Sequence, residues 1–341
     1  MRLLVSALER SANLHLSYLL PHLDAELIGI FDASLGDPLV DLQSLSVMGF
    51  VDALGKLPFF LRLKSRMVEL AAEADKVLLI DGSGFNLPLA KSIKARYPNK
   101  EIFYYILPQA WAWRRGRIEK IERYVDHALS ILPFESRFYC DSYDIRYVGH
   151  PLLDEITSFK SAPTPDGPVA FLPGSRRREI ASLMPLFRQV RQKIDKEALL
   201  VVPPHFKDLS LYGDISGFEI VRDTHRALCQ SSFAFVCSGT ATLESALIGT
   251  PLALVYQANP IDYHIAKMFA HIDKVGLANI LMQEAGYEAM HPEFLQKEAS
   301  AHNLLRAYHA SDPQTFLERS RLLREYLGHG SAKKVAEAID G

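Results

Sequence analysis

The chain has 341 residues, of which 48% are hydrophobic and 23% are charged, and this composition excludes a disordered or collagen-like protein. Its 38 Lys and Arg residues nearly balance its 40 Asp and Glu residues, and the resulting net charge of −2 argues against a protein that coats nucleic acid. The length suggests about two domains, each large enough to bury a core without disulfides or metals.

Cysteine usage and apolar runs indicate the compartment. Cys140, Cys229 and Cys237 are widely spaced and form no Cys-x-x-Cys pair, so they predict neither a disulfide framework nor a zinc site and suit a reducing cytoplasm. The first apolar run stops at Glu9, too early for a signal peptide. The longest apolar stretch, residues 245–256, is shorter than the roughly 20 residues of a membrane span. We therefore expect a protein that is soluble or peripherally bound to a membrane.

Short apolar runs alternate with amphipathic stretches along the whole chain. The runs are four to eight residues long and mostly bounded by Gly, Pro, Asp or Ser, which is typical of buried strands. Predicted strands are residues 2–7, 27–31, 76–80, 102–106, 128–132, 145–148, 169–172, 199–202, 233–237 and 252–256. Predicted helices include residues 87–96, 114–123, 178–193 and 240–248. The alternation favours two parallel sheets of five or six strands, covered by helices.

A stretch of linker composition separates the two groups of strands. Residues 152–168 contain three prolines and little apolar periodicity. We expect one domain over residues 1–155 and another over residues 156–310. A purely helical tail is expected over residues 311–341.

Polar side chains follow two strands of the first group. The turn after the first strand contains Glu9, Ser11 and Asn13, and the third strand is followed by Asp81. Ligands of doubly wound sheets bind at the carboxyl ends of strands, so these residues are placed to meet one. Asp81 is a candidate general base or hydroxyl acceptor. Ser11, Asn13 or Asp81 could equally cap the helix that follows. The Gly-Ser-Gly after Asp81 is too incomplete for a dinucleotide fingerprint.

Two turns of small residues follow strands of the second group. They are Gly174-Ser175-Arg176 and Ser238-Gly239-Thr240. Their backbone N–H groups can approach a phosphate, and Arg176 adds positive charge. Each alone could be an ordinary capped turn, but together they point to a nucleotide diphosphate, with Glu244 a candidate for the ribose hydroxyls. Because the chain has no Walker lysine motif and no Asp-x-Asp pair, neither P-loop chemistry nor a metal-clamped diphosphate is expected.

Residues 48–67 combine an apolar helical stripe with basic side chains. The stripe contains Phe50, Val51, Leu54, Leu57, Phe60 and Leu61. Such a segment can lie in a membrane interface, although stripes of this kind usually belong to a core. Downstream, Trp113 and Arg114 could line an acceptor site or contact anionic headgroups, or form a packed loop and a solvated helix. His150 in Gly-His-Pro is a lone histidine, which is more often structural than catalytic.

Several of these segments, in the order found here, resemble the lipid-A-disaccharide synthases, bacterial glycosyltransferases of the GT-B type. The resemblance extends from Leu3 to about Lys333. Trp111-Ala112-Trp113-Arg114 and Leu132-Pro133-Phe134-Glu135 are its most specific segments. The others include Glu9-x-Ser11, Met48-Gly49-Phe50, Ile80-Asp81, Phe85-Asn86, Gly149-His150-Pro151, the two phosphate turns and Ala278-Asn279-Ile280.

The resemblance implies a GT-B architecture, in which two Rossmann-like parallel-sheet domains face a cleft. The N-terminal domain would hold a lipid acceptor, the C-terminal domain a UDP-sugar donor, and the tail helices would return to the N-terminal domain. The implied reaction is inverting and needs no cofactor or metal. It joins UDP-2,3-diacylglucosamine to 2,3-diacylglucosamine 1-phosphate (lipid X), forming the β-1′,6-linked lipid A disaccharide 1-phosphate and UDP. The implied location is the cytoplasmic surface of the inner membrane, with peripheral attachment, and a homodimer is compatible with it.

The resemblance also implies roles for individual residues. Asp81 or Glu9 would accept the proton of the acceptor hydroxyl. The donor diphosphate would meet residues 174–176 and 238–240, Glu244 would hold ribose, and Asn279 would orient phosphate or sugar. The acceptor side of the cleft would contain Ser11, Asn13, Asn86, Trp113, Arg114 and His150. The stripe would face the membrane through Phe50, Val51, Leu54, Leu57, Phe60 and Leu61.

Two departures from the family pattern concern the acceptor side. Where the family commonly reads Gly-Glu-x-Ser-Gly-Asp, this chain has Leu8, Ala12 and Asn13 at the two glycines and the final aspartate. Where the family reads Ile-Asp-x-Pro-Asp-Phe-Asn, Ser83 and Gly84 replace Pro-Asp. That second aspartate is the residue usually proposed as base, and glycine cannot serve. The proton acceptor must therefore be another group.

Two other functions remain open from the sequence. One is a UDP-N-acetylglucosamine epimerase of the same architecture, against which the apolar stripe argues. The other is a lipid-binding module without catalytic activity, which the loss of the aspartate at Gly84 would allow. The intact donor-side turns argue against that module, since it would have no need of them.

Overall fold

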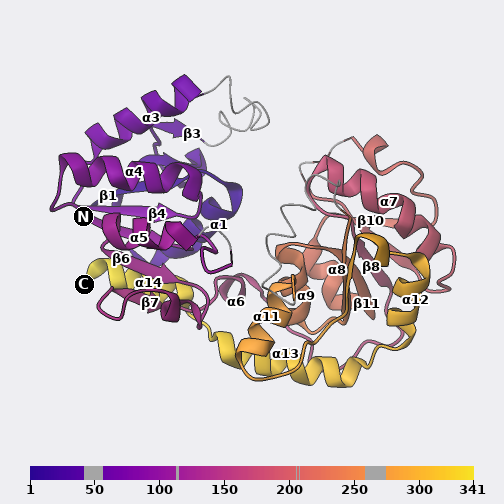
Figure 1. The fold of residues 1–341 in the computed structure, drawn as a ribbon. Coiled ribbons are helices and arrows are strands. Elements are labelled where there is room, and N and C mark those ends of the chain that lie inside the picture. The colour runs from indigo at the N-terminus through magenta and orange to yellow at the C-terminus, as the bar shows by residue number, and fades with distance from the viewer. Residues whose placement is uncertain (42–56, 113–114, 205, 207, 258–273) are drawn as a thin grey trace. The chain divides into compact units, whose positions relative to one another are not determined.

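The structure is a computed structural model that describes residues 1–341 except 42–56, 113–114, 205, 207 and 258–273. The chain divides into two compact units (Figure 1). The first contains Met1–Glu155 together with Leu327–Gly341, and the second contains Ile156–Tyr326. Each unit is a parallel sheet covered by helices, so the α/β fold class predicted from the sequence is confirmed.

Within the described residues, the first unit holds a seven-stranded parallel sheet in the order β3-β2-β1-β4-β5-β6-β7. The order reverses between β1 and β4, which makes the edge above these strands the switch point of a doubly wound sheet. The central strands are apolar on both sides because both faces are covered. The strands are β1 (Arg2–Ala7), β2 (Glu26–Phe31), β3 (Val40–Asp41), β4 (Lys76–Ile80), β5 (Glu101–Tyr105), β6 (His127–Ser130) and β7 (Ile145–Tyr147).

Helices pack on both faces of this sheet (Figure 1). On one face α1 and α14 bury apolar side chains such as Leu16 and Val335. On the other face α3, α4 and α5 contribute Met67, Leu89 and Ile121. The helices are α1 (Arg10–Leu19), α3 (Leu57–Leu70), α4 (Ser83–Arg96), α5 (Ile118–Tyr124), α6 (Leu152–Glu155) and α14 (Ser331–Asp340).

The second unit repeats this plan with a six-stranded parallel sheet in the order β10-β9-β8-β11-β12-β13. Its order reverses between β8 and β11, so its switch point lies above those two strands. The strands are β8 (Val169–Leu172), β9 (Ala198–Val201), β10 (Glu219–Val221), β11 (Phe233–Cys237), β12 (Leu252–Tyr256) and β13 (Glu293–Leu295).

An aromatic core lies beneath α7 and α12 in the second unit. Phe171, Phe187 and Phe235 are fully buried there and pack ring against ring at centroid distances of 5.2–6.4 Å. Helices α8 and α9 pack on the strands as well. The helices are α7 (Arg177–Arg191), α8 (Thr224–Gln230), α9 (Thr240–Ile248), α11 (Leu277–Glu284), α12 (Ala301–His309) and α13 (Pro313–Leu327).

The predicted strands are observed with small shifts at their ends. β1, β4, β8, β11 and β12 have the predicted bounds, and the other five differ by one or two residues. The sequence missed β3, β10 and β13, which are two or three residues long and lie at the edges of their sheets. Segments this short show no apolar alternation, so pairing with a neighbour decides that they are strands.

The tail is helical but broken. Gly328 and Gly330 have left-handed backbone angles of 59° and 84°, and they separate α13 from α14. Asp154 caps α14, because its carboxylate accepts hydrogen bonds from the N–H groups of Gly330 at 2.8 Å and Ala332 at 2.9 Å. This cap attaches the last helix to the first unit.

Candidate functional site

A pocket of about 320 Å³ lies at the carboxyl edge of the second sheet, at its switch point. The turns after β8 and β11 form its two sides, and residues from the ends of β9 and α8 complete it. The sequence-predicted residues Gly174, Ser175, Arg176, Ser238, Gly239 and Thr240 all line it. The two phosphate turns are therefore brought together, although about 60 residues separate them in the sequence.

The first turn is shaped by Gly174 and Glu179. Gly174 has a left-handed φ of 103°, and a Cβ there would lie 2.5 Å from Glu179 Oε2, so only glycine fits. Glu179 Oε2 accepts the N–H groups of Ser175 and Arg176, each at 3.2 Å. Its Oε1 accepts from Arg176 Nη1 at 2.8 Å, and this contact raises the pKa of Arg176. The Glu179 carboxylate thus stabilises the turn by hydrogen bonds to its backbone. The Arg176 side chain remains 82% exposed.

The second turn leads into α9. Gly239 precedes the helix and, like Thr240, is exposed. A helix begins with N–H groups that have no intrahelical acceptor and with the positive end of its dipole, which together favour an anion. The guanidinium of Arg176 and this helix N-terminus line the same pocket. The pocket is therefore suited to a dianionic or diphosphate group.

Glu179 was missed by the sequence analysis, and so were Thr224 and Cys237, which also line the pocket. A glutamate three residues after the N-cap is the signature of a capping box, which could have identified Glu179. Burial raises the pKa of the Cys237 thiol to about 12, so this cysteine is a neutral apolar wall of the pocket.

Two predicted donor-side residues lie outside the pocket lining. Glu244 is half-buried on α9 and makes contacts within the protein. Asn279 is fully buried, and its Nδ2 donates to the His291 carbonyl at 2.9 Å and to Glu293 Oε1 at 2.7 Å. Its Oδ1 accepts the N–H of Met290 at 2.8 Å. The amide of Asn279 thus holds the segment that enters β13.

A second cluster of predicted residues lies at the switch point of the first sheet. Asp81 directly follows β4 and has a left-handed φ of 50°, which is unusual for a residue with a side chain. The Asp81 side chain is half-buried, and this burial raises the pKa of its carboxyl group, although the Gly82 N–H and the nearby His15 act in the opposite direction. Strained backbone and a desolvated carboxylate at a strand end are features of functional sites.

The buried amides of Asn86 and Asn13 form hydrogen bonds with backbone groups at this edge of the sheet. Asn86 is fully buried on α4, and its Nδ2 donates to the carbonyls of Asp81 at 2.8 Å and Ile80 at 3.2 Å. Asn13 is buried as well, donates to the Ala7 carbonyl at 2.8 Å and accepts the Asp32 N–H at 2.7 Å. Both asparagines, which the sequence placed at the acceptor side, therefore hold the backbone of the strand ends.

The accessible residues at this edge are fewer than predicted. Glu9 and Ser11 are exposed at the start of α1. His150 is 4% exposed and accepts the Leu152 N–H at 3.3 Å, and burial lowers its pKa to about 3, which leaves it neutral. Gly84 is exposed in the first turn of α4, with open space where a side chain would begin. Asp81 and Glu9 are thus the carboxylates among the predicted acceptor-side residues.

Part of the predicted membrane and tryptophan segments lies outside the described residues, namely Phe50, Val51, Leu54, Trp113 and Arg114. The described part of the stripe continues into α3, which starts at Leu57 and has Pro58 in its first turn. Leu61 is 52% exposed on this helix, and Phe60 is half-buried. Among the described residues, no helix has the length and apolarity needed to cross a bilayer.

The two segments that most specifically indicated the family in the sequence, around Trp111 and around Phe134, pack against each other. The Trp111 ring meets Phe134 edge to face at 4.9 Å. Glu135 is 1% exposed and accepts the Ser130 hydroxyl at 2.5 Å, and burial raises the pKa of its carboxyl group to about 7. These side chains therefore form an internal polar and aromatic cluster.

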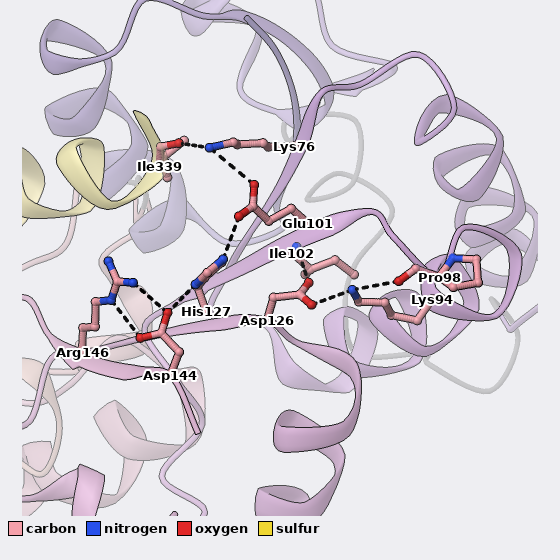
Figure 2. A network of polar contacts seen from close by, with 10 residues as sticks. All are labelled: Lys76, Lys94, Pro98, Glu101, Ile102, Asp126, His127, Asp144, Arg146 and Ile339. Carbon is pink, nitrogen blue, oxygen red and sulfur yellow. Dashed lines mark hydrogen bonds and ion pairs between the residues drawn. The ribbon is translucent and has the colours of Figure 1, made fainter. Parts of the chain in front are cut away.

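The amino edge of the first sheet carries a different polar network, which Figure 2 shows. Lys76, Glu101 and His127 are the first residues of β4, β5 and β6. His127 Nε2 lies 2.8 Å from Glu101 Oε1, and its Nδ1 contacts Asp144, which Arg146 Nε meets at 2.8 Å. These contacts join the amino ends of adjacent strands and are consistent with a structural role.

A larger hollow of about 480 Å³ lies at the amino edge of the second sheet. Phe233 and Leu252, the first residues of β11 and β12, line it. Because doubly wound sheets bind ligands at their carboxyl edge, the smaller pocket at the switch point is the better candidate site.

Comparison with known proteins is consistent with this geometry. Residues 3–324 match the family model described as lipid-A-disaccharide synthetase. The chain is 46% identical over 355 residues to a lipid-A-disaccharide synthase of Helicobacter pylori, covering 99% of this chain and 97% of that protein.

Solved structures support the fold alone. The calicheamicin glycosyltransferase CalG4 aligns with a TM-score of 0.59 at 15% identity, covering 99% of this chain and 97% of CalG4. A UDP-N-acetylglucosamine 2-epimerase of Neisseria meningitidis aligns with a TM-score of 0.58 at 9% identity, covering 99% of both chains. Glycosyltransferases and epimerases thus share this GT-B architecture.

Proposed function

Because the chain belongs to the lipid-A-disaccharide synthase family, it is a glycosyltransferase of lipid A biosynthesis, and we propose that it uses UDP-2,3-diacylglucosamine as donor and lipid X as acceptor. The products are the β-1′,6-linked lipid A disaccharide 1-phosphate and UDP. The observation that carries this proposal is the pocket at the switch point of the second sheet, where Arg176 and the N-terminus of α9 line one space. Membership of this family does not favour the alternative that the protein is an epimerase.

On the donor side, Arg176 and α9 hold the diphosphate of UDP. Arg176 uses one N–H for Glu179, and its planar guanidinium keeps other donors for phosphate oxygens. The charge that develops on UDP as the glycosidic bond breaks is stabilised by these donors, which are already in place. Glu244 on α9 receives ribose hydroxyls, and Asn279 supports the site by holding the segment before β13.

On the acceptor side, Asp81 removes the proton of the acceptor 6-hydroxyl while the oxygen attacks the anomeric carbon from the face opposite UDP. A raised pKa suits this role, because a carboxylate with a higher pKa is a stronger base. Glu9 is the second candidate and is exposed just before α1. Ser11 lies two residues further along the chain, in the first turn of α1.

The acyl chains of the substrates require contact with a lipid surface, and we assign that contact to the first unit. The exposed Leu61 lies on α3 among Arg62, Lys64 and Arg66. Apolar insertion combined with basic residues favours an anionic interface. The protein then works at the cytoplasmic surface of the inner membrane, attached peripherally.

The test is an assay of UDP release with purified protein, both lipid substrates and detergent, with the mass of the lipid product measured. Acceptor-dependent UDP release with a disaccharide 1-phosphate as product is the expected result. UDP-sugar binding without product would favour the lipid-binding module, and conversion of UDP-N-acetylglucosamine to its 2-epimer would favour the epimerase. Either of those two results would refute the proposal.

A further inference from the structure

Glu179, in the first turn of α7, has a carboxylate whose two oxygens bind different partners. Oε2 accepts the N–H groups of Ser175 and Arg176, each at 3.2 Å, and the second of these contacts belongs to a capping box. Oε1 accepts from the guanidinium of Arg176, through Nη1, at 2.8 Å. A capping box requires only the contact with the backbone, so the contact with the guanidinium is an additional feature of this turn.

The contacts of Glu179 limit what the first turn can offer to a phosphate. Two backbone N–H groups of the turn already have the carboxylate as their acceptor. Gly174 allows this close approach, because a Cβ at that position would lie 2.5 Å from Glu179 Oε2. The turn therefore presents the side chain of Arg176 to the donor pocket, in addition to its small residues.

Glu179 is a fixed support for this guanidinium. An ion pair between two exposed side chains contributes little to stability, because both side chains must become ordered. The side chain of Glu179 is only 13% exposed and is already held by the two backbone N–H groups. Ile180 and Leu183, which follow it on α7, are at most 1% exposed and attach the helix to the core. The side chain of Arg176 is 82% exposed, so its orientation depends on the pair.

We propose that Glu179 is a positioning residue, which holds Nη1 of Arg176 so that the other guanidinium N–H groups meet the donor diphosphate. This inference rests on the proposed function. As the bond between the anomeric carbon and the diphosphate breaks, UDP leaves with the electron pair and the negative charge on its phosphate oxygens increases. A guanidinium that is already in place stabilises this added charge without reorganisation. The N-terminus of α9 acts on the same group from the other turn.

The negative charge of Glu179 makes its effect on turnover different from its effect on binding. The carboxylate has the same sign of charge as the diphosphate, so its charge does not favour binding of the intact donor. The orientation that it gives to Arg176 becomes more important as charge develops on UDP. Interactions that are stronger in the transition state than in the ground state raise kcat rather than lower KM. Loss of Glu179 should therefore lower kcat without raising the donor KM.

The experiment is Glu179→Gln, assayed for acceptor-dependent UDP release. The amide oxygen of glutamine can still accept the N–H groups of the turn, whereas its NH2 group cannot accept from Nη1. We expect kcat to fall about 10- to 100-fold, the scale for misplacement of a group in a preorganised site. The donor KM should stay within about twofold, and the melting temperature should stay close to that of the unaltered protein. In an Arg176→Ala background, Glu179→Gln should cause no further loss of kcat, because the residue acts through Arg176.

Asp312→Asn is the matched control, because it also replaces a capping carboxylate of the second unit by an amide. Asp312 accepts the N–H groups of Gln314 at 3.0 Å and Thr315 at 3.2 Å, and it does not line the donor pocket. This variant should leave kcat near that of the unaltered protein. If Glu179→Gln does not fold, Glu179→Asp replaces it, since aspartate keeps the charge but is one methylene shorter. That variant is read through the same Arg176→Ala double variant.

A Glu179→Gln kcat within about twofold of that of the unaltered protein would overturn the positioning role. A loss that multiplies with the loss from Arg176→Ala, or that consists of a raised donor KM and a lowered melting temperature, would show that Glu179 only stabilises the turn. Either of these results would overturn the proposal as well. Absence of acceptor-dependent UDP release by the unaltered protein would instead refute the proposed function, and the positioning role with it.

Discussion

The Ser6 hydroxyl donates a 2.7 Å hydrogen bond to Asn86 Oδ1 and thereby joins β1 to the first turns of α4. The other end of the same amide donates to the carbonyl groups of Ile80 and Asp81. One buried side chain thus connects the two strands at the switch point and stabilises the left-handed turn that presents Asp81.

Asn86→Ala should therefore destabilise the first unit and impair catalysis together. The Ser6 hydroxyl and two carbonyl groups lose their partner in a buried place, which we expect to lower the free energy of unfolding by about 2–3 kcal/mol. Urea denaturation and kcat measure the two effects. Asn99→Ala, at an exposed position, is the control. Equal stability of the two variants would contradict this account of Asn86.

Asp81→Asn should lower kcat at least about 100-fold, the usual scale for loss of a general base. Donor KM should change little, because the donor pocket lies in the second unit. Initial rates at saturating acceptor measure the effect, with Asp141→Asn as an exposed control. Near-normal turnover would transfer the role to Glu9 or another group.

The pH dependence of kcat should carry the signature of a buried carboxylate. Asp81 must be ionised to accept a proton, so activity falls as the pH drops through its pKa. Burial raises that pKa, so the acid limb should lie above the roughly 3.9 of an ordinary aspartate. The limb should be absent from the residual activity of Asp81→Asn. A limb shared by both proteins would belong to a different group.

Arg176→Ala should act through the donor. We expect kcat/KM for the UDP-sugar to fall about 100- to 1,000-fold, the scale for loss of one preorganised donor to a developing charge. Binding of UDP, measured by calorimetry, should weaken in parallel. Arg178→Ala removes an exposed arginine from the first turn of α7, the helix that Arg176 precedes, and should change neither quantity. Unchanged kcat and KM in Arg176→Ala would refute the donor-site assignment.

Gly174→Ala should disrupt the same turn by a steric route. The new Cβ would need a left-handed φ, at about 1–2 kcal/mol, and would also meet Glu179 Oε2 at 2.5 Å. Gly286→Ala is the control. Gly286 also has a left-handed φ, but a Cβ at this position would have open space around it. Melting temperature and UDP affinity should therefore both fall further for Gly174→Ala. Similar values for the two variants would argue that the glycine is needed only for its backbone angle.

Leu61→Glu should reduce co-sedimentation with vesicles that contain anionic phospholipid. A charged side chain removes apolar contact from the exposed face of α3 and adds repulsion from the headgroups. Leu14→Glu is the control, since Leu14 is 46% exposed on α1 and Leu61 is 52% exposed. Equal loss of binding in both variants would place the lipid contact elsewhere.

The donor pocket could be anticipated from the sequence because its parts are local. At both Gly174–Arg176 and Ser238–Thr240 the sequence shows a buried strand, then a turn of small residues, then a helix. Parallel strands bring such turns to the same edge of the sheet. Glu179 was missed since its role depends on folding back onto the turn. Asn86 and Asn13 were read as acceptor-side residues, but burial commits their amides to the backbone.

What the sequence by itself determined is the alternation of apolar runs and amphipathic helices, the bounds of the central strands, and the residues of the two phosphate turns. These properties depend on neighbours a few positions away, so they can be read along the chain. The tertiary structure decided the strand order, the short edge strands, and the meeting of His15 with Glu155 across 140 residues. It decided them because register and burial are properties of packed elements: a carboxylate becomes a stronger base, and an asparagine a structural clamp, only when other segments remove the water around it.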